Sequence, residues 1–167
     1  RPLSLEFFAL PACSAPLREA AFLNLNTNGN NPMIHLKSFI AGFLATLIFH
    51  QGLLALLAAT GVIGASAYNL SPTEPLGIPA VISLAFWGGV WGIVLWLLVR
   101  ANHGLKRWIW AAVVGAIGPT AVALLIVFPL KGVDFDLGRV PVGLLLNGVW
   151  GLGTLCLLNG LRRIGSR

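Results

Sequence analysis

Residues 78–99 read IPAVISLAFWGGVWGIVLWLLV, and this stretch contains no charged side chain. An α-helix rises 1.5 Å per residue, so about 20 apolar residues cross the roughly 30 Å hydrocarbon core of a bilayer. The stretch therefore predicts a membrane-spanning helix. Three other segments have the same character, and we expect spans at residues 38–63, 78–99, 108–129 and 140–161.

The composition agrees with a membrane protein. Hydrophobic residues make up 57% of the chain and charged residues only 10%, with a mean hydropathy of +0.86. A soluble domain carries about 25% charged residues, so the soluble classes are excluded. The net charge of +6 does not indicate nucleic-acid binding, because Lys and Arg stand singly or in pairs beside apolar runs.

The basic residues predict an orientation. Seven Lys and Arg residues flank the spans on the side of the two termini, and two flank them on the opposite side. Because cytoplasmic segments carry the excess of Lys and Arg, this count predicts that both termini lie in the cytoplasm. The sequence thus predicts an all-α bundle of four transmembrane helices in a bacterial inner membrane. Its expected partners are the lipid bilayer and anionic lipid at the cytoplasmic face. The seven are Lys37, Arg100, Lys106, Arg107, Arg162, Arg163 and Arg167; the two are Lys131 and Arg139.

A short motif occurs twice, as Gly89-Val-Trp-Gly92 in the second span and as Gly148-Val-Trp-Gly151 in the fourth. Two helical hairpins in the same orientation would form a parallel repeat. Independent convergence on packing of small residues beside aromatic ones would produce the same motif, so both origins remain open.

The first residues differ from the rest. The only methionine is Met33, and the residues before it have short apolar runs that end in NTNGNNP, a turn-rich sequence. We expect residues 1–32 to be an N-terminal extension, either poorly ordered or foreign to the functional protein. Residues 33–167 then form the four-helix transmembrane domain.

Four polar residues are expected in one layer of the membrane: His50, Gln51, Thr120 and Asn147. The helical rise places His50 about 18 Å into its span, near the midplane. Polar side chains at this depth face the interior of the protein and find partners there. They predict either a small-ligand or proton-handling site, or hydrogen bonds between helices that fix helix register.

Glycines indicate close helix packing. Gly88 and Gly92 are four residues apart, and Gly148 and Gly151 lie together in the fourth span. Small residues let helix backbones approach closely in lipid. The same faces could join copies in a homo-oligomer or join the chain to a larger membrane complex.

No catalytic set is visible, and we expect no catalytic residues, no metal site and no cofactor. A bis-histidine haem needs two buried imidazoles, but only His50 lies within a span, and no span carries a carboxylate. The expected function is a non-enzymatic accessory or packing subunit. The alternative is a small-solute or proton-linked transporter or channel whose midplane site centres on His50.

The chain resembles a family of small, uncharacterised bacterial inner-membrane proteins with four spans. The likeness is carried by Phe49-His-Gln-Gly52, residues 75–92 (PLGIPAVISLAFWGGVWG) and residues 145–153 (LLNGVWGLG). It covers most of residues 33–160. The resemblance implies the four-span architecture and implies no activity.

Overall fold

The structure is a computed structural model that describes residues 32–132, 134 and 136–164. Within these residues, four helical segments are long and apolar enough to cross a membrane: Pro32–Ala59, Ala80–Val99, Gly104–Leu130 and Arg139–Ile164. The chain is a mostly helical, multi-pass membrane protein. The expectation for residues 1–32 falls outside the described residues, except that Pro32 already belongs to the first helix.

The first segment has three parts: α2 (Pro32–Ala45), a π-helical turn η1 (Thr46–His50) and α3 (Gln51–Ala59). It begins and ends earlier than the 38–63 expected from hydropathy. Proline is favoured at the first helical position, because its missing N–H has no helical partner there anyway. Gly61 lies just beyond the helix with φ +74°, a left-handed conformation that stops the helix.

A short antiparallel pair of strands, β1 (Pro72–Thr73) and β2 (Ile78–Pro79), leads into α4 (Ala80–Val99). The third segment contains α5 (Gly104–Val122), a second π-helical turn η2 (Ala123–Val127) and α6 (Phe128–Leu130). Pro119 lies inside α5 and cannot donate an N–H to the turn before it. The fourth segment is a single helix, α7 (Arg139–Ile164).

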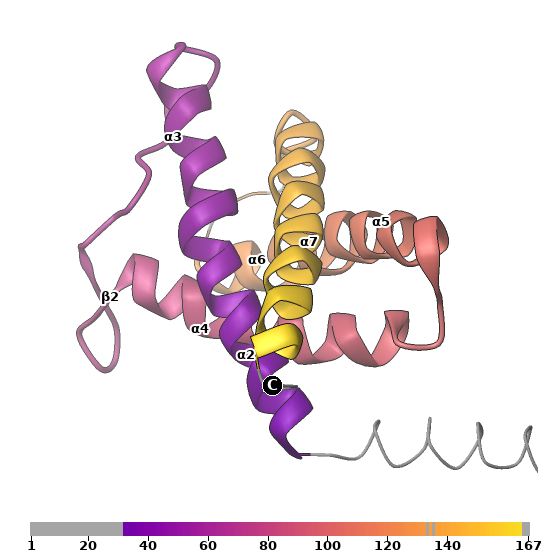
Figure 1. Cartoon of the computed structure of the whole chain (residues 1–167). Coiled ribbons are helices and arrows are strands. Elements are labelled where there is room, and N and C mark those ends of the chain that lie inside the picture. The colour runs from indigo at the N-terminus through magenta and orange to yellow at the C-terminus, as the bar shows by residue number, and fades with distance from the viewer. Residues whose placement is uncertain (1–31, 133, 135, 165–167) are drawn as a thin grey trace, which may run out of the picture. The chain divides into compact units, whose positions relative to one another are not determined.

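The helices cross one another steeply. In Figure 1, α2–α3 and α7 run from top to bottom, whereas α4 and α5 run from side to side. Helix α2 packs on α4 and α7, and α5 packs on α7. The four segments thus form two crossed pairs, α2 with α4 and α5 with α7, which meet through α2 and α7.

Glycines form the crossing between α2 and α4. A Cβ atom on Gly42 would meet the carbonyl oxygen of Gly88 and come within 2.9 Å of the Gly92 Cα atom. A Cβ atom on Gly92 would meet the carbonyl oxygen of Ser38. The two backbones are therefore in direct contact, as small residues allow in lipid.

The crossing between α5 and α7 has the same form. A Cβ atom on Gly151 would meet the carbonyl oxygen of Ala111 and lie 3.1 Å from the Gly115 Cα atom. A Cβ atom on Gly115 would lie 2.8 Å from the Asn147 carbonyl oxygen. Gly148 lies away from this contact, because its Cβ atom would meet Ala116 Cβ at 3.6 Å and the Ala112 carbonyl oxygen at 3.8 Å, both ordinary separations.

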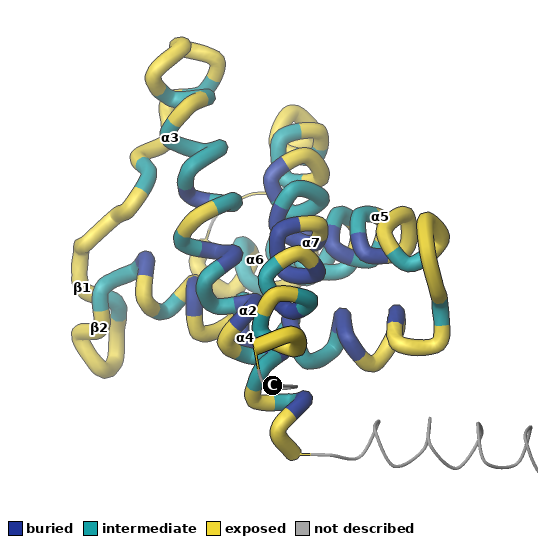
Figure 2. Tube along the Cα trace, viewed as in Figure 1, coloured by how far each residue is buried: buried dark blue, intermediate teal, exposed yellow. Residues whose placement is uncertain are grey.

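The two ends of the helices differ in charge and packing. We call the end with Lys37, Arg100, Lys106, Arg107, Arg162 and Arg163 the basic end, and the end with residues 60–79, 131–132, 134 and 136–138 the loop end. Buried residues gather where α2, α4 and α7 meet (Figure 2). The hydrophobic clusters lie toward the basic end. Their members are Ile34, Ala41, Trp96 and Leu158 in one, and Leu95, Val99, Ala111 and Leu155 in the other.

Candidate functional site

The loop end is hollow. A cavity of about 900 Å³ opens there, and residues from all four helical segments line it. Its wall is mostly apolar, with polar groups at the two ends. The lining includes Leu54, Leu84, Leu124, Phe128, Val142 and Leu146 along the wall, His50, Thr120 and Asn147 at depth, and Gly64, Ala65, Asp136, Gly138 and Arg139 near the mouth. Because the last five are exposed, the cavity reaches the surface of the described chain.

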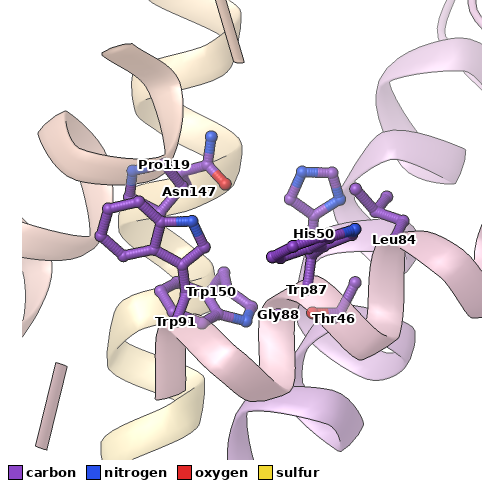
Figure 3. A pocket seen from close by; sticks show the side chains of 9 residues that line it. All are labelled: Thr46, His50, Leu84, Trp87, Gly88, Trp91, Pro119, Asn147 and Trp150. Carbon is purple, nitrogen blue, oxygen red and sulfur yellow. The ribbon is translucent and has the colours of Figure 1, made fainter. Parts of the chain in front are cut away.

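The cavity continues inward into a chamber of about 70 Å³. His50, Leu84, Pro119 and Asn147 line both spaces, so they mark the junction between them. Figure 3 shows His50 and Asn147 on opposite sides of this junction, with Leu84 beside His50 and Pro119 beside Asn147. The remaining side chains around the chamber are Thr46, Trp87, Gly88, Trp91 and Trp150.

Three of the four predicted polar residues meet at this cavity: His50, Thr120 and Asn147. The side-chain Nδ2 of Asn147 donates a 2.9 Å hydrogen bond to Thr120 Oγ1, which joins α7 to α5. Thr120 is buried, whereas His50 and Asn147 are half-buried. The site therefore offers hydrogen-bonding side chains from three of the four helical segments.

Gln51 points elsewhere and lines neither space. It is buried, and its Oε1 accepts a 2.7 Å hydrogen bond from the backbone N–H of Tyr68. Its Nε2 lies 3.5 Å from Nδ1 of His50, at the outer limit of a hydrogen bond. Neighbouring residues on a helix do not share a face, so only one of this pair faces the cavity.

Tyr68 ties the loop to the first helix a second time. Its hydroxyl donates a 2.9 Å hydrogen bond to the carbonyl oxygen of Leu47, inside the π-helical turn η1. In this turn the N–H of Gln51 bonds to Thr46, five residues back. A π turn carries an extra residue per turn, and such turns occur frequently at functional sites.

The chamber borders the crossing of α2 and α4, which hydrogen bonds hold together. The carbonyl oxygen of Gly42 accepts from Trp150 Nε1 at 3.1 Å and from Thr46 Oγ1 at 2.9 Å. Trp91 closes another side, where its ring lies 2.9 Å from the position of a Cβ atom on Gly118. The packed basic end begins beyond these residues.

The mouth carries one ion pair, between Arg139 Nε and Asp136 Oδ2 at 3.5 Å. The Arg139 Cζ atom also lies 5.6 Å from the centroid of the Phe128 ring. Both charged side chains are about half exposed, and ion pairs of this kind contribute only about 0–1 kcal/mol. The opposite charges leave the mouth without a strong preference for anions or cations.

The described residues contain no group of three or more His, Cys, Asp or Glu side chains that could hold a metal ion. The arrangement can bind an uncharged molecule by hydrogen bonds and apolar contact. Sequence reasoning missed Trp87 and Phe128 as lining residues of these spaces. The position of Phe128 near the end of an apolar run was the available signal.

Fold and cavity together define a multi-pass helical membrane protein with a ligand-sized cavity open at one end. No protein-family model, curated protein or solved structure matches the chain. The resemblance to small four-span bacterial inner-membrane proteins therefore stays a prediction.

Proposed function

We propose that this chain is a non-enzymatic inner-membrane protein that takes up a small uncharged solute through its loop end, as a transporter or channel. The observation that carries the proposal is the cavity of about 900 Å³, lined by all four segments and narrowing to His50 and Asn147. Concave, mostly apolar cavities with a few convergent polar groups are the usual form of ligand sites. An apolar wall with a hydrogen-bonding end suits a solute that has both kinds of surface.

The orientation of the chain is part of the proposal. The excess of Lys and Arg at the basic end supports a cytoplasmic location for that end and for both termini. The cavity then opens to the outside of the bacterial inner membrane, and the packed basic end closes the path to the cytoplasm.

We also propose that the fold consists of two parallel helical-hairpin repeats. Gly92 and Gly151 end the same Gly-Val-Trp-Gly motif, and each lies against a backbone carbonyl of the preceding hairpin helix. Gly92 lies against the carbonyl of Ser38, which is four residues before Gly42, and it also contacts Gly42. In the same way, Gly151 lies against the carbonyl of Ala111, which is four residues before Gly115, and it also contacts Gly115. These matched contacts support duplication, and in that arrangement the cavity would lie between the two hairpins.

Thiol labelling tests whether water and solute reach the cavity. Ala123 lines it, whereas Ile126 belongs to the same π-helical turn and is exposed on the outside of the chain, where lipid would cover it. In a Cys13→Ser/Cys156→Ser background, we expect a charged, membrane-impermeant methanethiosulfonate to label Ala123→Cys and to leave Ile126→Cys unlabelled. Thiols react as thiolates, which form in water and not in lipid. Failure to label Ala123→Cys would mean a sealed cavity and would favour the accessory-subunit function.

Solute flux tests the transport step itself. Vesicles containing the protein should reswell faster than protein-free vesicles after an osmotic shock with glycerol, an uncharged solute with hydroxyl groups. Labelling at Ala123→Cys should abolish the difference. Equal reswelling rates with and without protein, for glycerol and for other uncharged solutes, would argue against transport.

A further inference from the structure

Three helices bring their charged ends together around one tryptophan at the basic end. Trp96 of α4 is buried, with 5% of its surface exposed. The Cζ atom of Arg162 from α7 lies 5.0 Å from the centroid of its ring, and the Cζ atom of Arg107 from α5 lies 5.8 Å away. A guanidinium over an indole face within about 6 Å is held by a cation–π interaction.

These two positive charges repel each other and have no carboxylate partner among the described residues. Among the described residues, the one ion pair is formed by Arg139 at the loop end. The described acids Glu74, Asp134 and Asp136 also lie in the loops of that end. The arrangement therefore has a local positive potential that an anion would neutralise.

Arg107 is held in position by neutral groups. Its Nε donates a 2.6 Å hydrogen bond to the carbonyl oxygen of Asn102, and an Nη atom donates at 3.2 Å to that of Arg100. These bonds fix the guanidinium at the loop between α4 and α5 without cancelling its charge. A guanidinium fixed in this way loses less conformational entropy when it binds a ligand.

One buried nitrogen of this cluster also lacks a partner. Trp96 Nε1 is inaccessible to solvent and makes no hydrogen bond. Buried polar atoms are nearly always paired, so an unpaired donor beside two guanidinium groups indicates a missing acceptor.

We propose that Arg107, Arg162 and Trp96 form a binding site for the phosphate group of an anionic membrane lipid. Trp96 lies three residues before the end of α4, about 4.5 Å along the helix axis, and tryptophan near the end of a membrane-crossing helix is typical of the headgroup region. Arginine binds phosphate through paired, charge-assisted hydrogen bonds. The site is separate from the cavity and does not depend on the proposed transport function.

Native mass spectrometry of the full chain in detergent, titrated with short-chain phosphatidylglycerol, tests this site. Phosphatidylcholine, with no net charge, and inorganic phosphate serve as the other two probes. We expect phosphatidylglycerol to bind most tightly of the three probes. Arg107→Gln and Arg162→Gln should each lower the affinity for phosphatidylglycerol about tenfold, because each removes a charge-assisted pair of hydrogen bonds to the phosphate. Inorganic phosphate that saturates the protein at the same concentration as the lipid would overturn the lipid assignment.

Lys106→Gln is the matched control. Lys106 is exposed beside Arg107, so this variant removes the same charge from the same end without touching Trp96. Its affinity for phosphatidylglycerol should equal that of the unmodified chain, and Arg162→Lys, which keeps the charge and loses the planar fork, should bind more weakly than Lys106→Gln. Equal losses in Lys106→Gln and the arginine variants would mean diffuse attraction and no site. If Arg107→Gln and Arg162→Gln fail to fold, the comparison of Arg162→Lys with Lys106→Gln still decides between a site and diffuse attraction.

Discussion

The amide of Asn147 donates a 2.9 Å hydrogen bond to the hydroxyl of Thr120, in the wall of the outer cavity beside its junction with the inner chamber. The two residues lie on different helices and are 27 positions apart in the chain. Their bond lies near the α5–α7 crossing, where the Asn147 backbone also contacts Gly115. This polar pair therefore belongs both to the wall of the site and to the packing of one helix pair.

A double-mutant cycle measures the strength of that bond. We expect Asn147→Ala and Thr120→Val to show a coupling energy of about 0.6 kcal/mol in the free energy of unfolding, with an upper bound of about 1.7 kcal/mol. Unfolding in mixed micelles of increasing SDS content gives the four values. Asn159, another asparagine of α7, is the control, and Asn159→Ala should combine additively with Thr120→Val. A coupling as large with Asn159 would contradict a direct bond.

The crossing of α2 and α4 predicts a strict size limit at Gly92. Gly92→Ala should lower the free energy of unfolding by about 1–3 kcal/mol, because the added methyl group meets the Ser38 carbonyl and cannot move away from backbone. Gly160→Ala in α7 is the matched control, since a Cβ atom there meets nothing within 4 Å. Equal stabilities of the two variants, measured by thermal unfolding in detergent, would contradict the observed crossing.

The bond between Gln51 and Tyr68 predicts local control of the outer loop. Gln51→Leu removes the acceptor of the Tyr68 N–H, so hydrogen exchange at that amide should speed up at least several-fold. NMR-detected exchange in micelles resolves this one amide. Thr73→Val is the control, because it removes only a bond to Ile78 within the loop and should leave the Tyr68 amide unchanged. An unchanged exchange rate in Gln51→Leu would show that Gln51 does not hold the loop.

The charge asymmetry predicts the topology. In the background without native cysteines, a membrane-impermeant maleimide should label Ser66→Cys in intact cells and should label Lys106→Cys only after permeabilisation. Both positions are exposed, and they lie at opposite ends of the helices. The reverse pattern would place the basic end outside, against the positive-inside rule.

The sequence predicted the four membrane-crossing segments because apolar runs of this length have one main explanation. It also led to Gly88, Gly92 and Gly151, which lie at the crossings. Gly42 was missed, although Ser38, Gly42 and Thr46 repeat every four residues, and that spacing was a usable signal.

The site was harder to predict, for two reasons. His50 and Gln51 were grouped because they are adjacent in sequence, but adjacent helical residues point in different directions. One π-helical turn ends at His50 and the other begins four residues after Pro119, and both change which backbone carbonyls lack a helical partner. No sequence pattern fixes where such turns occur. The cavity depends on how steeply the helices cross, a tertiary property that apolar composition does not specify.

The steep crossings have a consequence for how a path through the molecule could arise. Two rods that touch at one point diverge on both sides of it, so each crossing creates two wedges of equal opening. At the basic end the wedges are filled by large side chains such as Trp96 and Leu158, and at the loop end they are left empty. Side-chain volume therefore decides which half of the molecule is hollow. If large side chains filled the loop end and small ones the basic end, the cavity would open at the basic end while every helix kept its position.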